Sequence, residues 1–256
     1  MRNYLVFTIA APMASFGMKY DPGEWRNSSN RPSKSGVLGL VAAALGIERE
    51  EQARFDALRD SLGFAVRVDQ PGQTAYDYHT AQVPPQKRNR RFATRADELA
   101  VPKHELKTVL STREYRTNAF ATPALWFRAG VIKAHFSLWS IAAALKQPRF
   151  NLYAGRKSHP LMLPCAPEVI EAGDALAAFT AYDAATERLA NFQEAYLGRE
   201  SDPKRRPAAT IYCDADDPAA ASSTRIEQRR DVPESRTKWR FGVRQEAVIA
   251  PRGGQT

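Results

Sequence analysis

The segment Arg2-Asn3-Tyr4-Leu5-Val6-Phe7-Thr8-Ile9-Ala10 and the segment Pro32-Ser33-Lys34-Ser35-Gly36-Val37-Leu38-Gly39-Leu40 set the architecture of the chain. The first is apolar and rich in β-branched and aromatic residues, which predicts a buried or half-buried strand. The second opens an apolar helix from Val37 to about Leu45, with Ser33 or Ser35 as N-cap and Gly46 after its last turn. Between them, the 22 residues from Ala11 to Pro32 are long for a connector, and long ordered loops are usually functional.

Further elements follow from the same patterns. We expect a helix over 50–62 and a strand over 64–68, with a turn at Pro71-Gly72. Later in the chain we expect strands at 124–127 and 131–136, then a helix at 138–145 and a strand at 210–213. This order predicts an α+β fold of the ferredoxin-like, RNA-recognition type: a βαββαβ sandwich with the helices on one face of an antiparallel sheet.

Composition restricts the class of protein. The chain has 256 residues, 43% of them hydrophobic, which suffices for a large core and excludes a disordered chain. The apolar runs are about half of the ~20 residues that a membrane-spanning helix needs. The N-terminus lacks the continuous apolar region of a signal peptide. Two cysteines without C-x-x-C spacing argue against a disulfide framework or a cysteine zinc site. We therefore expect a reduced, cytoplasmic protein without a metal or cofactor.

The positive charge is concentrated in one segment. Lys and Arg number 37 against 28 Asp and Glu, a net charge of +9. Residues 79–116 hold nine Lys/Arg and four Asp/Glu, so they contribute +5 of that charge. The segment is also poor in large apolar side chains. We predict an inserted arm at 79–113, between two parts of one RNA-recognition-like domain at 1–78 and 114–256.

Cations alternate with aromatic residues at three places, namely Lys87-Arg88-Asn89-Arg90-Arg91-Phe92, Arg113-Glu114-Tyr115-Arg116 and Tyr153-Ala154-Gly155-Arg156-Lys157. Cations neutralise phosphates, and aromatic rings stack on unpaired bases, which is how proteins hold single strands. A charge run alone is usually a solvated face, but three clusters that each contain an aromatic residue favour a nucleic-acid partner.

Patterns typical of catalysis are weak. Lys34-Ser35-Gly36 lacks the earlier glycine of a P-loop, so it is either an ordinary capped helix start or a phosphate site at a helix N-terminus. No histidine pair has metal-ligand spacing, and no G-x-S-x-G is present. Asp214, Asp216 and Asp217 lie in an Ala/Pro/Ser-rich segment that indicates a flexible loop. Lys103-His104 leaves one alternative open: a metal-independent endoribonuclease that uses His104, Lys103 and a tyrosine.

Five blocks of the sequence resemble the CasD family of CRISPR-associated proteins, the fifth Cas family of the RAMP superfamily. They occur in the family's order from residue 2 to about 165. The resemblance is weak after Pro164, apart from a basic-aromatic segment near Arg236–Phe241. The blocks are Tyr4-Leu5 with 11–17, 31–40 with 45–47, 77–80, 112–116 and 153–161. His159 stands where the family usually has cysteine.

The resemblance implies a non-catalytic subunit of a type I-E Cascade complex. Such a subunit holds the 5′ handle of the CRISPR RNA (crRNA) and caps one end of the backbone. Its thumb, here roughly 79–113, touches the backbone subunit and the large subunit that reads the PAM on nearby target DNA. The predicted RNA-binding residues are Phe16, Arg26, Lys34, Ser35, Lys87, Arg88, Arg90, Arg91, Arg113, Tyr115, Arg116, Tyr153, Arg156, Lys157 and Ser158. The aromatic residues of the loop, Phe16, Tyr20 and Trp25, are expected to stack on or wedge between bases, as is Tyr115. The helix start at Lys34-Ser35 and the loop Arg156-Lys157-Ser158 are expected to hold phosphates.

Overall fold

The computed structural model describes residues 1–17, 24–86, 91–130, 136–186, 209–235, 238 and 240–250. Strands dominate it. The strands are β1 (Arg2–Val6), β2 (Ile9–Ala14), β3 (Trp25–Arg26), β4 (Leu62–Gln70), β5 (Gln73–Val83), β6 (Lys107–Phe127), β7 (Glu168–Ala172), β8 (Thr210–Asp214), β9 (Arg225–Ser235) and β10 (Arg240–Ile249). The helices are α1 (Lys34–Ala44), α2 (Gln52–Ser61), α3 (Arg95–Leu99), α4 (Leu138–Lys146) and α5 (Ala175–Thr186), with short 3-10 helices η1 (Lys103–Glu105) and η4 (Pro218–Ser222).

The described strands form one sheet with the order β7-β1-β6-β4-β8-β10-β9, and β2, β3 and β5 also pair with β6. Within it, β7, β1, β6 and β4 are neighbours and all antiparallel. The chain passes from the N-terminal strands to β4 through α1 and α2, and from β6 to β7 through α4. A mixed architecture built on a large antiparallel sheet is therefore confirmed.

Helices cover both faces of this sheet, so the prediction of helices on one face is wrong. Leu5 of β1 and Phe7 just after it pack in a core with α1, α2 and α4. Tyr4 and Val6, which alternate with them along the strand, pack with Phe179 and other residues of α5 in a second core. Residues in a strand point alternately to its two faces, and both faces of β1 are apolar. The sequence analysis did not predict α5, which lies after the region of resemblance.

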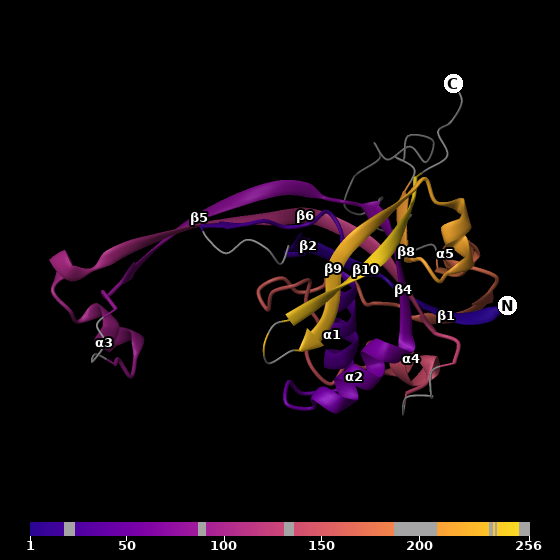
Figure 1. Cartoon of the computed structure of the whole chain (residues 1–256), viewed down its shortest axis with the longest axis horizontal. Coiled ribbons are helices and arrows are strands. Elements are labelled where there is room, and N and C mark those ends of the chain that lie inside the picture. Colours follow the sequence, from indigo (N-terminus) through magenta and orange to yellow (C-terminus); the bar gives the residue numbers. More distant parts are fainter. Residues whose placement is uncertain are drawn as a thin grey trace, which may run out of the picture.

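A long arm leaves the body along β5 and β6 (Figure 1). Its paired residues run from Gln73↔Thr117 out to Val83↔Lys107, and α3 lies near its end. Pro71-Gly72 does not turn the chain back, contrary to the prediction, because β4 and β5 run in the same direction along β6. Gly72 has a φ of +71°, and a Cβ there would lie 2.4 Å from the Thr117 carbonyl oxygen. The pairing thus starts at Gln73, six residues before the start of the predicted arm at residue 79.

The boundaries of the other elements agree with the predictions to within a few residues for α1, α2, α4, β4 and β8. Ile9–Ala14 is a separate strand, β2, so the predicted loop from Ala11 begins as a strand. The predicted strand at 131–136 lies outside the described residues except for its last member. The 214–221 segment is not a flexible loop, because Asp214 and Asp217 are buried and η4 follows them.

Candidate functional site

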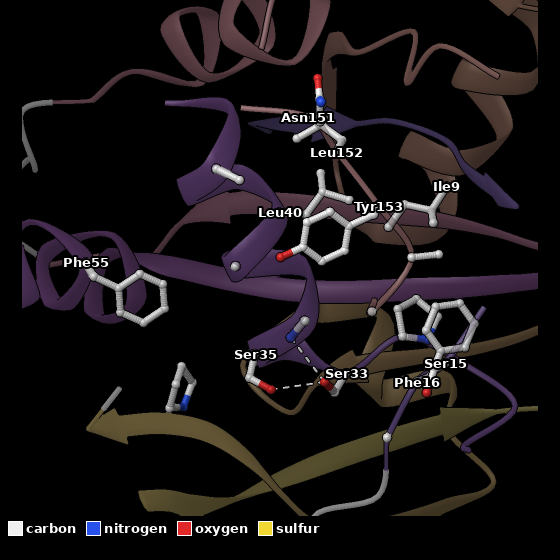
Figure 2. Close-up of a pocket in the computed structure, with 18 of the residues that line it drawn as sticks. Ile9, Ser15, Phe16, Ser33, Ser35, Leu40, Phe55, Asn151, Leu152 and Tyr153 are labelled. Carbon is white, nitrogen blue, oxygen red and sulfur yellow. Dashed lines mark hydrogen bonds between the residues drawn. The ribbon is translucent and has the colours of Figure 1, made fainter. Parts of the chain in front are cut away.

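A groove of about 480 Å³ lies beside α1 and extends along the helix from Ser35 to Ala43 (Figure 2). One wall is α1 itself, and the opposite wall is the segment Asn151–Gly155. Phe16, just after β2, and Phe241 of β10 contribute two further aromatic side chains. The lining is Ile9, Ser15, Phe16, Gly17, Pro32, Ser33, Ser35, Gly36, Gly39, Leu40, Ala43, Arg49, Phe55, Asn151, Leu152, Tyr153, Ala154, Gly155, Pro233 and Phe241. Three predicted site residues, Phe16, Ser35 and Tyr153, therefore meet in one groove.

The N-terminus of α1 is occupied by groups of this chain. Ser33 caps it, since its hydroxyl oxygen accepts a hydrogen bond from the Gly36 amide at 3.1 Å. The Lys34 amide donates to a carboxylate oxygen of Asp231 at 2.8 Å. A helix N-terminus binds anions through such amides and its dipole. A buried carboxylate already fills that role here, so the site is unfavourable for a phosphate.

Lys34 is an internal cation, which corrects the prediction that it holds a phosphate. Its side chain is 2% exposed, and its Nζ lies 2.7 Å from Asp214 Oδ2. Arg128 and Arg244 contact the same carboxylate at 2.6 and 2.9 Å. Burial lowers the pKa of Lys34, although the Asp214 charge opposes that shift. Withdrawing this ammonium from its carboxylate would leave a buried charge less well compensated, which is costly.

Asp231 connects α1 to the C-terminal strands. It accepts a hydrogen bond from Arg244 Nε at 2.7 Å as well as from the Lys34 amide. Burial alone would raise the pKa of this carboxyl, but the charges of Arg244 and Arg229 outweigh it and hold the pKa below its ordinary value. Arg229 and Arg244, two of the basic residues near the C-terminus, therefore form ion pairs inside the fold.

The loop from Tyr153 to Pro160 is held against the body at Gly155. Gly155 has a φ of +88°, and a Cβ there would lie 1.9 Å from the Ser15 carbonyl oxygen. The Ser15 amide donates to the Ala154 carbonyl at 3.0 Å, and Tyr153 forms a β-bridge with Pro160. This close approach is possible only without a side chain. It places Tyr153 in the wall of the groove.

Tyr115 lies beneath this loop and is only 7% exposed, so the prediction that it stacks on RNA bases is wrong. Arg156 donates to its hydroxyl at 2.9 Å and lies over its ring, and His159 packs edge-on against that ring with centroids 5.2 Å apart. Tyr115 supports the loop rather than a ligand. Lys157 and Ser158 lie at the exposed end of the loop.

The predicted cations of the arm lie in different surroundings. Arg116 is paired with Glu114 at 3.1 Å, which reduces its value for binding phosphate. Arg26 is exposed on β3 and is in register with Arg113 of β6. Arg91 is exposed near the end of the arm. Lys87, Arg88 and Arg90 lie outside the described residues.

Exposed aromatic side chains share one face of the arm near its base. Trp25, Tyr76 and Tyr78 are 56%, 65% and 61% exposed. The Trp25 and Tyr76 rings lie 6.3 Å apart, nearly perpendicular to each other. The register places Tyr78 and Trp25 next to the same residue of β6, Thr112, from its two sides. The sequence analysis predicted Trp25 as a stacking residue but did not single out the two tyrosines, which alternate along β5. Tyr20, predicted with Trp25, lies outside the described residues.

Sequence reasoning also missed part of the groove. Phe55, Asn151, Pro233 and Phe241 come from four separate segments, and no local pattern connects them. Gly39 could have pointed to the groove from the sequence alone. Glycine inside an apolar helix lowers the stability of that helix, so its presence there suggests a packing or functional reason.

The structure also shows where the residues considered for a catalytic or metal site lie. Lys103 and His104 are exposed in η1 of the arm, and residues 91–106 contain no tyrosine. Within the described ranges, no cluster of three or more His, Cys, Asp or Glu side chains is arranged to hold a metal ion. None of the helices described is long and apolar enough to cross a bilayer.

Comparisons with known proteins agree on one family. Residues 4–246 match the family model described as CRISPR-associated protein (Cas_Cas5). The chain is 32% identical over 191 residues to the CRISPR system Cascade subunit CasD of Escherichia coli (strain K12), which covers 72% of this chain and 78% of that protein.

Two solved structures share the fold. One is a chain of a CRISPR RNA-guided surveillance complex, with a TM-score of 0.59, 22% identity, and coverage of 98% of this chain and 95% of that chain. The other is a crystal structure of a Cas protein, with a TM-score of 0.56, 22% identity, and coverage of 98% of each chain. At this identity the two likenesses show the fold alone.

Proposed function

Because the chain belongs to the CRISPR-associated Cas5 family, we propose that it is a non-catalytic, RNA-binding subunit of a type I-E Cascade surveillance complex. It holds the 5′ handle of the crRNA and caps one end of the backbone. Its relative CasD is named as a Cascade subunit, and the match extends over most of both chains. Its partners are then the crRNA, the backbone subunit and the large PAM-reading subunit, with target DNA nearby.

One observation carries the RNA-binding part of this proposal: the Tyr153–Pro160 loop brings Arg156 and Lys157 next to the aromatic groove beside α1. Single strands are held by cations that follow the backbone and aromatic rings that stack on the bases. Both kinds of side chain occur on the same short loop. Lys157 is exposed, so its ammonium can reach a phosphate without disturbing the fold.

The finer fold assignment belongs to the same proposal. The antiparallel order β7-β1-β6-β4, with helical crossovers from β1 to β4 and from β6 to β7, supports a ferredoxin-like βαββαβ unit. Strands β8, β10 and β9 extend that unit at β4, and β2, β3 and β5 pair with β6. The β5/β6 arm then corresponds to the thumb, which contacts RNA and neighbouring subunits.

The endoribonuclease alternative gains no support from the geometry. Lys103 and His104 lie on the arm, and the nearby stretch 91–106 contributes no tyrosine to complete the set. General acid–base catalysis requires its groups within hydrogen-bond reach of one reacting site. A non-catalytic role therefore remains our proposal.

Binding to the repeat RNA of the protein's own CRISPR array tests this function. The full chain is titrated against labelled RNA in EDTA at several salt concentrations. We expect intact RNA, with an affinity that falls as salt rises. Lys157→Ala should weaken binding and reduce the slope of log K against log salt by about 0.7 if it removes one phosphate contact. The double variant Arg156→Ala/Lys157→Ala should lose more.

Lys146→Ala is the matched control, since it removes the same charge from an exposed position on α4. It should keep the affinity and the slope of the wild type. Equal effects of Lys157→Ala and Lys146→Ala would exclude the loop as the site. Cleavage in EDTA that disappears in His104→Ala would replace the scaffold with the endoribonuclease.

A further inference from the structure

We propose that the groove beside α1 holds one unpaired nucleobase of the bound RNA, while the sugar–phosphate chain stays outside at the loop 156–158. This inference rests on the proposed function and specifies what that site recognises. Residues of α1 and of the segment that leads into this loop line the same groove (Figure 2).

The groove has the size and lining for a planar, largely apolar group. Its volume, about 480 Å³, lies within the range of pockets that enclose small organic molecules. Tyr153, which is 36% exposed, and the half-buried Phe241 line it with accessible rings, whereas Phe16 is only 9% exposed and packs with Ala14 and Ala154 in the wall. Aromatic rings stack on every base, because every base has a π-face.

The polar groups in the groove are mainly neutral. Ser33, Ser35 and Asn151 line it, and the hydroxyl oxygens of the two serines lie 3.0 Å apart. An amide such as that of Asn151 both donates and accepts hydrogen bonds, as the edge of a base requires. Such groups suit the edge of a base better than a phosphate.

Charge places the phosphates outside. Among the described residues that line the groove, Arg49 is the charged one, and it is exposed. Asp231, at the start of α1, does not line the groove and is paired with Arg244 and Arg229. Lys157 is exposed on the adjoining loop. The charge distribution therefore orients a nucleotide with its base inward and its backbone outward.

Gly39 is the residue that this proposal explains. It lies in the middle of α1, where glycine is less favourable than alanine. Its φ is not positive, and a Cβ there would meet no heavy atom within 4 Å. No contact within the described chain therefore requires glycine at this position. The missing side chain instead enlarges the groove, together with Gly36 and Ala43 on the same helix face.

The test combines a groove-filling variant with an abasic scan. Repeat RNAs that lack one base at a time are titrated against the full chain by fluorescence anisotropy. For wild type, we expect one position at which loss of the base weakens binding about tenfold, the value of one aromatic stack. Gly39→Leu should bind intact RNA about as weakly as wild type binds that abasic RNA, and should be insensitive to the missing base.

Two further variants separate folding from binding. Gly39→Ala should raise the melting temperature, because alanine favours the helix, and should still weaken binding of intact RNA. Ala143→Leu adds bulk to an exposed position of α4 outside the groove and should bind as wild type does. If Gly39→Leu does not fold, the affinity of Gly39→Ala for intact RNA decides whether the groove binds a base.

The outcomes distinguish this inference from the proposed function. Wild type that binds RNA with the same affinity at every abasic position overturns the groove assignment and leaves RNA binding intact. Gly39 variants that bind and discriminate as wild type does overturn it too. A wild-type chain that binds none of these RNAs overturns the proposed function, and the inference with it.

Discussion

Lys34 shows that residue type and spacing do not reveal where a side chain points. The sequence Lys34-Ser35-Gly36 at a helix start is compatible with phosphate binding, yet the ammonium pairs with Asp214, 180 residues away in sequence. Tyr115 is a second case, because it supports the 153–160 loop through Arg156. Lys157, by contrast, lies at the surface, as its predicted role requires. For charged and aromatic residues, the contacts of the side chain decide between an internal and a binding role.

Lys34→Met should therefore act on stability and not on RNA binding. The substitution leaves Asp214 buried with one cation fewer, and breaking a buried ion pair typically costs about 3–5 kcal/mol. Because Arg128 and Arg244 still contact Asp214, we expect the low end of that range, about 3 kcal/mol, in urea denaturation. A variant of unchanged stability with weakened RNA binding would show that Lys34 leaves its pocket to contact phosphate.

Among the elements, the arm differs from the rest in how its residues are buried. The body strands alternate between two cores, whereas β5 has no buried residue. A two-stranded ribbon in water is marginally stable by itself. Near the end of the arm, Val101 is buried, but the helices α3 and η1 contain no buried residue. The arm therefore contributes surface to the protein rather than core.

Replacing residues 84–106 by Asn-Gly should leave the body intact. Val83 and Lys107 are directly opposite in the hairpin, and Asn-Gly closes such pairs as a two-residue turn. We expect the free energy of unfolding to change by less than about 1 kcal/mol, since surface changes outside special features have small effects. The same variant removes Lys87, Arg88, Arg90 and Arg91, whose predicted RNA contacts remain untested.

RNA titrations of this variant decide their role. A smaller salt slope than that of wild type would support phosphate contacts from the cations that the deletion removes, which are these four together with Arg95 and Lys103. An unchanged slope would restrict RNA binding to the body and to the base of the arm, where Arg26 and Arg113 lie.

For the protein as a unit, the buried ions join the N-terminal and C-terminal parts of the chain. Arg31 pairs with Glu246 at 2.6 Å, and Asp231 with Arg244 and the start of α1. Tyr4 of β1 donates to Asp217, which also accepts a hydrogen bond from the amide of Ala175, the first residue of α5. Local signals cannot encode such pairs. These ion pairs and hydrogen bonds explain why the region after Pro164, where the resemblance is weak, is needed to complete the fold of the N-terminal part.

These ions predict an acid-sensitive fold. The pKa of Asp231 is lowered in the folded protein, so its contribution to stability is present above the pKa of the unfolded state, about 3.9, and is lost as pH falls through the folded value. Asp231→Asn should be less stable than wild type at pH 7. The difference should narrow below about pH 4, in urea denaturation at a series of pH values.

A difference that stays constant from pH 7 to pH 2.5 would contradict this reading. It would mean that the carboxylate charge contributes nothing beyond the hydrogen bonds that an amide can retain. Asp60→Asn is a suitable control, because Asp60 is an exposed partner of Arg59 and surface pairs contribute little.

The sequence by itself determined the mixed α/β class of the fold, most of the early helices and strands, the basic charge of residues 79–116 and the family. Those properties depend on local periodicity, capping residues and charge runs, which adjacent residues encode. Of the predicted RNA-binding residues, Phe16 and Tyr153 line the groove, and each stands in a local cluster of aromatic and basic residues.

Only the tertiary structure decided which of those residues reach the surface. It buried Lys34 and Tyr115, added α5 on the second face of the sheet, and joined Phe55, Asn151 and Phe241 in one groove. The physical reason is that burial and ion pairing depend on contacts between segments far apart in the chain. The free energy of a side chain is set by those contacts, and they form only when the sheet is complete.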